Sequence, residues 1–140
     1  MEELWALRTA IEEQRYPDAL LLLGELEEMS KDDKVEKIYS TIVILLLHLI
    51  KRAAEKRTTR SWDLSIEEAL RRIKRTNKRR KAGGCYLVPE ELAETIAEAY
   101  PEALSRAALE AFGGLYEAQH LATLVDEAAI QYEALNLIQA

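Results

Sequence analysis

The chain has 140 residues, 49% of them apolar, and its 19 Lys and Arg against 25 Asp and Glu give a net charge of −6. This length fits one ordinary domain with a real core, and the acidic balance argues against general nucleic-acid binding. The single cysteine, Cys85, excludes an internal disulfide, which favours a reducing compartment, and we expect a cytoplasmic protein. No signal peptide or membrane-spanning segment is expected from the acidic start and the short apolar runs.

The first helices are predicted on either side of Tyr16-Pro17. Apolar residues at helical spacing predict a helix over residues 2–14. Pro17 suits the first turn of a second helix, which should run to about Met29. Ser30 followed by Asp33 is a capping pattern, and it predicts the start of a separate third helix.

That third helix, near residues 36–56, is the most informative one. From Ile38 to Ile50 the sequence is apolar nearly all round, apart from Ser40, Thr41 and His48. A helix without a polar face must be surrounded by other helices. With good helix formers dominant throughout, the sequence predicts an all-α fold, a bundle of about five to seven helices around one central buried helix.

The later helices are predicted from capping residues and from the glycines and prolines that interrupt helices. A capping box of Ser65 with Glu68 predicts a fourth helix that starts between Ser61 and Ser65. This helix should fade at residues 81–82 and stop at Gly83-Gly84. The remaining expected helices begin at Pro89, resume after a break at Tyr100-Pro101 to about residue 112, and finally cover 116–138. We expect a helical domain over 1–112, with 113–140 as a helical extension packed on it.

Charge is strongly polarised along the chain. Residues 1–50 carry 5 basic and 11 acidic side chains, residues 51–81 carry 13 and 4, and residues 82–140 carry 1 and 10. Within the basic run 71–81, at about 100° per residue, one set of cations falls opposite Ile66, Leu70 and Ile73. We name this set the cationic face: Arg71, Arg72, Lys74, Arg75, Lys78 and Arg79.

Three interpretations of the cationic face stay open. It is a solvated face that pairs internally with the acidic helices, a docking surface for an acidic protein or a second copy, or a contact for nucleic-acid phosphates. The basic run has no aromatic residues within it for base stacking, and Trp62 lies on the apolar stripe of the same helix.

No catalytic, cofactor or metal motif is evident. His48 lies within a Leu-rich run and is interpreted as a core histidine whose hydrogen-bond partner lies in the Arg60-Ser61-Trp62 region. Cys85 and the histidines lack metal-ligand spacing, and Gly83-Gly84 lacks the Lys-Ser/Thr ending of a phosphate loop. Cys85 is expected to be buried or half-buried. No cofactor is expected, and an enzyme using His48 is only a third hypothesis.

Three segments resemble a known family. They are the acidic helix end in residues 25–34, the His-Leu-Ile-Lys run in 45–51, and the Arg-Ser-Trp element in 56–66. Together they resemble the cyanobacterium-rich domain-of-unknown-function family twenty-nine over about residues 4–112. The resemblance implies a helical fold without an established activity. It also implies a structural cluster of family-signature residues: His48, Lys51, Arg60, Ser61 and Trp62.

The leading functional hypothesis is a non-enzymatic interaction protein. Its cationic face, or its apolar C-terminal helix, would dock an unidentified protein or a second copy. The alternative is a nucleic-acid-binding accessory factor, or an antitoxin-like protein, that uses the basic helix 71–81.

Overall fold

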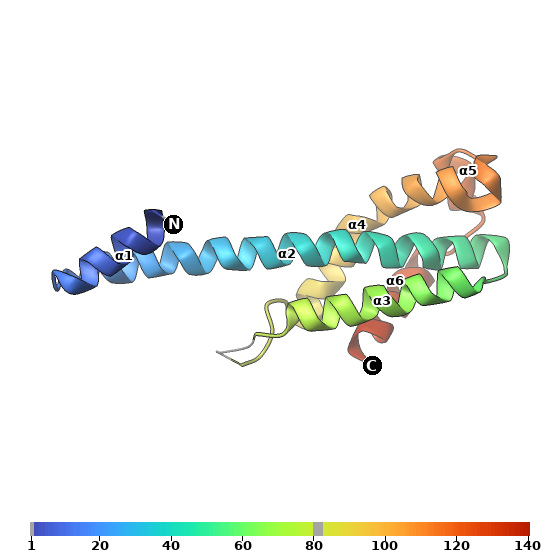
Figure 1. The fold of residues 1–140 in the computed structure, drawn as a ribbon. Coiled ribbons are helices and arrows are strands. Elements are labelled where there is room, and N and C mark those ends of the chain that lie inside the picture. Colours follow the sequence, from blue (N-terminus) through green and yellow to red (C-terminus); the bar gives the residue numbers. More distant parts are fainter. Residues whose placement is uncertain (1, 80–82) are drawn as a thin grey trace. The chain divides into compact units, whose positions relative to one another are not determined.

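The computed structural model describes residues 2–79 and 83–140 (Figure 1). Within these ranges the chain is all-α, with no strand beyond an isolated antiparallel bridge between Lys78 and Cys85. The elements are α1 (Glu2–Glu12), α2 (Tyr16–Glu55), α3 (Arg60–Asn77), α4 (Pro89–Glu110), the 3₁₀ segment η1 (Ala111–Gly114), α5 (Ala118–Thr123) and α6 (Glu127–Gln139). The predicted all-α helix bundle is confirmed.

The chain divides into two compact units, Met1–Lys34 and Val35–Ala140, with the boundary inside α2. In the first unit α1 and the beginning of α2 form a helical hairpin (Figure 1). The amide of Arg15 closes its turn by donating to the Ala10 carbonyl oxygen at 2.7 Å. Ala10 and Ala19 are buried, whereas Trp5 and Leu20 are 71% and 69% exposed. This hairpin therefore leaves much apolar surface open to solvent.

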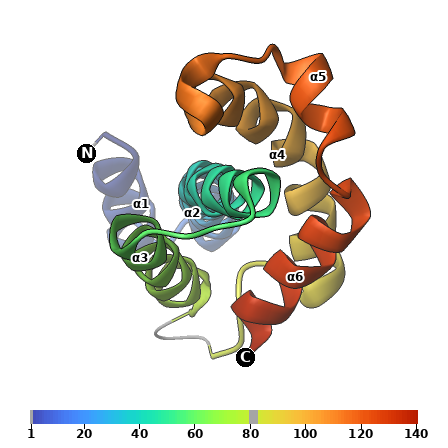
Figure 2. The ribbon, with the colours of Figure 1, turned by 90° about the vertical axis from the view of Figure 1, so that its right-hand side faces the viewer.

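The second unit is built around α2. The segment from Ile38 to Ile50 supplies most of the fully buried side chains of the core, and Leu45 and Ile50 have no exposed surface. Viewed nearly along α2, helices α3, α4 and α6 lie around this segment (Figure 2). The prediction of a central buried helix is confirmed, because its nearly continuous apolar surface is covered on several sides.

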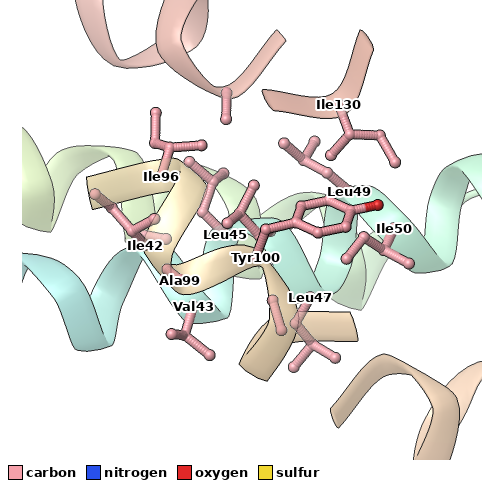
Figure 3. Packing of buried hydrophobic residues seen from close by; sticks show 14 of the residues in the cluster. Ile42, Val43, Leu45, Leu47, Leu49, Ile50, Ile96, Ala99, Tyr100 and Ile130 are labelled. Carbon is pink, nitrogen blue, oxygen red and sulfur yellow. The ribbon is translucent and has the colours of Figure 1, made fainter. Parts of the chain in front are cut away.

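Helix α4 packs a stripe of small residues into this core. Ala99, Ala103 and Ala107 recur at four-residue spacing and are all fully buried. Figure 3 shows Ala99 and Tyr100 among the buried side chains of α2, with Ile130 of α6 nearby. The buried Tyr100 hydroxyl has no hydrogen-bond partner among the described residues. Burial first, then the Glu127 and Asp126 carboxylates, raise the pKa of Tyr100 to about 12.

Two predicted helix breaks are wrong. Residues 30–33 lie within the continuous helix α2, because no Gly or Pro interrupts the good helix formers of this stretch. Tyr100-Pro101 lies within the continuous helix α4. Proline cannot donate to the carbonyl of Ala97, but both residues are exposed, so water can satisfy that carbonyl on the outer side of the helix.

Other boundaries also differ from the predictions. Thr59, and not Ser65, caps α3, and its hydroxyl accepts from the Trp62 amide at 3.1 Å. The predicted last helix is two helices, because the Asp126 carboxylate accepts from the Ala129 amide and starts α6 anew. The expected fade of the fourth helix at 81–82 lies outside the described residues, as do Arg80 and Lys81 of the basic run.

Candidate functional site

Helix α3 separates an apolar side from a cationic side. Ile66, Ala69 and Ile73 are buried against the second unit's core. All six residues of the cationic face are exposed. Four of them lie in the second half of α3, and Lys78 and Arg79 directly follow the helix. The 3.6-residue repeat of the helix produces this separation, since the apolar positions recur on one side and the basic ones on the other.

The middle of the cationic face borders an open hollow of about 500 Å³, lined by Glu68, Arg71, Arg72 and Arg75. None of these three arginines makes a side-chain hydrogen bond or an ion pair with any described residue. Three guanidinium groups thus gather within two helical turns with only Glu68 beside them. Internal pairing with the acidic helices, one of the sequence-based interpretations, is not found for these arginines in the part of the chain that the structure describes.

The other end of the cationic face has neighbours. The Lys74 ammonium donates to the Ala140 carbonyl oxygen at 2.8 Å. The Arg79 guanidinium lies 5.7 Å from the centroid of the Tyr86 ring, within the range of a cation–π contact. The first contact ties α3 to Ala140 after α6, and the second ties the residues after α3 to the connector before α4.

A second hollow, of about 400 Å³, adjoins this end. We name it the apolar hollow, because Leu87, Leu92 and Ile138 contribute buried apolar side chains to it, while Lys74 and Lys78 of the cationic face also line it. The Asn77 side chain fixes one wall: its amide donates to the Leu87 carbonyl oxygen at 2.9 Å, and its oxygen accepts from the Leu87 amide at 2.7 Å. Cationic and apolar groups therefore stand side by side at this place.

Two of the family-signature residues meet in a buried charge cluster. Lys51, in the last turn of α2, is only 4% exposed. Its ammonium donates to Glu110 Oε1 at 2.8 Å and lies 4.6 Å from the centroid of the Trp62 ring. The Arg57 guanidinium lies 4.8 Å from the centroid of the same ring. This cluster ties together the ends of α2 and α4 and the beginning of α3.

His48 lies beside this cluster but is not hydrogen-bonded as predicted. Its buried Nδ1 has no hydrogen-bond partner among the described residues, so the prediction of a partner in the Arg60-Ser61-Trp62 region is wrong. Burial is the main cause that lowers the pKa of His48, and the Lys51 charge lowers it further, while Glu110 acts in the opposite direction. Burial and the Lys51 charge thus favour the neutral imidazole over the charged one.

The remaining signature residues, Arg60 and Ser61, are exposed in the first turn of α3.

Sequence reasoning missed two partners of the cluster. Glu110 is 59 positions from Lys51 along the chain, so no local pattern could find it. Glu55 links the end of α2 to η1 by accepting from the Phe112 amide at 3.1 Å, and it also binds Arg57.

The other side chains that could bind a metal or react lie outside the cationic face and the Lys51 cluster. Cys85 is exposed, so the expectation of a buried or half-buried thiol is wrong. His120 lies on the surface. Across the ranges 2–79 and 83–140, no group of three or more His, Cys, Asp or Glu side chains is placed to hold a metal ion. No described helix combines the length and the hydropathy that a membrane crossing requires.

The fold and these clusters define an all-α helical protein with a buried lysine held by Glu110 and Trp62, and with a basic outer helix face. The family model described as "Domain of unknown function DUF29" matches residues 9–115. The chain belongs to this family, as the sequence resemblance predicted. No curated protein and no solved structure gives a significant match.

Proposed function

We propose that the protein is a non-enzymatic interaction protein that binds an acidic protein surface through its cationic face. The supporting observation is the open hollow beside Arg71, Arg72 and Arg75, which make no ion pair or side-chain hydrogen bond with any residue that the structure describes. Guanidinium groups bind carboxylates through two parallel hydrogen bonds, and unpaired arginines on a rigid helix are already arranged for such contacts. The neighbouring apolar hollow adds room for an apolar side chain of the partner.

An acidic protein is preferred over a nucleic acid for two reasons. The net charge of −6 repels any anionic partner, and it opposes a nucleic acid more strongly, because a nucleic acid carries the higher density of negative charge. Among the described residues, Tyr86 is the one aromatic ring in contact with the cationic face, whereas single-stranded nucleic acids are bound by several stacked rings. Nucleic-acid binding therefore stands as the alternative outcome of the test.

A cytoplasmic location is part of the same proposal. The exposed thiol of Cys85 has no second cysteine in the chain with which to pair, and such a thiol is typical of a reducing compartment. A cyanobacterial source stays a prediction from the sequence resemblance.

The test compares two fluorescent probes, a glutamate-rich peptide of about twelve residues and a single-stranded RNA of similar length, by anisotropy at low and high salt. We expect the peptide to bind at low salt and to weaken as salt screens the contacts. The double variant Arg71→Glu/Arg75→Glu should weaken peptide binding by roughly tenfold or more.

The matched control is Lys56→Glu/Arg106→Glu, which changes the net charge equally at exposed positions outside α3. It should retain peptide binding within about twofold. Binding of the RNA but not of the peptide would replace the proposal by the nucleic-acid alternative. Equal losses in both double variants would show that only net charge matters, and would remove the cationic face as a specific site.

A further inference from the structure

The first unit carries an outer surface that is both acidic and apolar. Residues 1–34 contain 10 acidic and 4 basic side chains. Their exposed large apolar side chains include Trp5 at 71%, Leu20 at 69% and Leu21 at 67%. Soluble domains do not usually leave several large apolar side chains together in water, and such patches mark interaction surfaces.

Along the beginning of α2 these two properties share one helix face. Leu20, Leu21, Glu27 and Glu28 are all exposed and fall within about 120° of the helix circumference. We name this set the acidic-apolar face. Its leucine pair and its glutamate pair are seven residues apart, which corresponds to about 10 Å along the helix axis.

The second unit carries the complementary arrangement on α3. Arg71 and Arg72 border the open hollow, and Asn77, the last residue of α3, lines the apolar hollow six residues after Arg71. This separation corresponds to about 9 Å along the helix. An acidic pair and an apolar pair on one side thus match, at a similar spacing, a cationic hollow and an apolar hollow on the other.

We propose that the occupant of the cationic face is a second copy of this chain, which docks its acidic-apolar face there. Glu27 and Glu28 of one copy meet Arg71 and Arg72 of the other, and Leu20 and Leu21 enter the apolar hollow. This inference rests on the proposed function and names its partner. Each copy has both surfaces, and a two-fold axis that forms the contact twice closes the assembly as a dimer.

The experiment mixes two full-length variants of opposite design. One variant is Glu27→Lys/Glu28→Lys and keeps its cationic face, whereas the other is Arg71→Glu/Arg72→Glu and keeps its acidic-apolar face. Each variant alone would bring like charges together, so light scattering after size-exclusion chromatography should give the mass of one chain. The wild type at low salt should give twice that mass, with loss of the dimer at about 1 M salt, where charges are screened within about 3 Å.

An equimolar mixture of the two variants should restore the double mass, because each altered surface then meets an oppositely charged one. A contact within one chain cannot be restored by mixing, so recovery establishes contact between copies. Circular dichroism of each variant should match the wild type, since all four positions are exposed.

The outcomes separate this inference from the function on which it rests. A wild type that keeps the mass of one chain, or a mixture that stays dissociated, overturns the dimer even if the glutamate-rich peptide still binds through Arg71 and Arg75. Peptide that neither binds nor competes with the dimer overturns the proposed function itself. Peptide that dissociates the dimer in proportion to its binding supports both.

Discussion

Replacing either partner of the Lys51–Glu110 pair should lower the free energy of unfolding, and the two replacements should do so by unequal amounts. Lys51 Nζ lies 2.8 Å from Glu110 Oε1, and the side chains are 6% and 48% exposed. Glu110→Gln leaves a buried ammonium without its carboxylate. Breaking a fully buried pair costs about 3–5 kcal/mol, and the half-exposed position of Glu110 reduces this to about 2 kcal/mol. The Trp62 ring retains part of the stabilisation of the ammonium.

Lys51→Met should lower the free energy of unfolding by less than Glu110→Gln does. Methionine keeps an apolar stem in the buried position, and the freed Glu110 carboxylate can turn to water, so we expect a loss below about 1 kcal/mol. The matched control is Glu102→Gln, whose ion pair with Arg106 is exposed at 3.7 Å on the same helix and should contribute at most about 0.5 kcal/mol.

Urea unfolding followed by circular dichroism measures all three variants. The reasoning requires that Glu110→Gln be the most destabilised of them. If Lys51→Met proved equally or more destabilised, the ammonium would be a net stabilising group and not a buried charge that needs its partner, and the argument would be refuted.

Three further perturbations test the fold around this cluster. Burial lowers the pKa of His48 below its usual 6.5, so the unfolded chain takes up the proton at a higher pH than the folded chain. The free energy of unfolding should therefore fall as the pH drops below about 6.5, and urea titrations of His48→Leu should lack that fall. Tyr100→Phe removes a buried hydroxyl without a partner and should raise the unfolding free energy by up to about 1 kcal/mol. Because the pKa of Tyr100 is raised from 10.0 to about 12, wild-type stability should decline between these pH values, and no such tyrosine contribution should remain in Tyr100→Phe. Thr59→Ala removes the cap of α3 and should cost about 1 kcal/mol in thermal unfolding, whereas an unchanged melting temperature would contradict the assigned cap.

The central helix and the cationic face were accessible from the sequence because each depends on local periodicity. Ile38 to Ile50 has almost no polar position, and the basic residues of α3 recur opposite its apolar ones. The direction in which these side chains point follows from the helix alone. That Arg71, Arg72 and Arg75 make no ion pair with any described residue does not follow from the helix, since it depends on where the acidic helices lie.

The errors arose where a local signal competed with the rest of the fold. Ser30 and Asp33 resemble a helix start, but the same residues are tolerated on the exposed side of a continuous helix. Pro101 resembles a break, yet the burial of Ala99, Tyr100 and Ala103 on the inner side keeps α4 intact. The partner of Lys51, and the lack of a hydrogen-bond partner for His48 Nδ1 among the described residues, depend on parts of the chain distant in sequence, which a single sequence cannot assign.

The alanine stripe of α4 has a consequence for how this chain can change over time. Ala99, Ala103 and Ala107 have no exposed surface, so even a small increase in side-chain size there would force the surrounding helices apart. The outward residues of α3 have no such neighbours and can exchange one charge for another at little cost in stability. Folding thus depends on the inner side chains of α4, whereas the outward side chains of α3, through which we propose that the protein binds a partner, can diverge among related chains while the architecture is preserved.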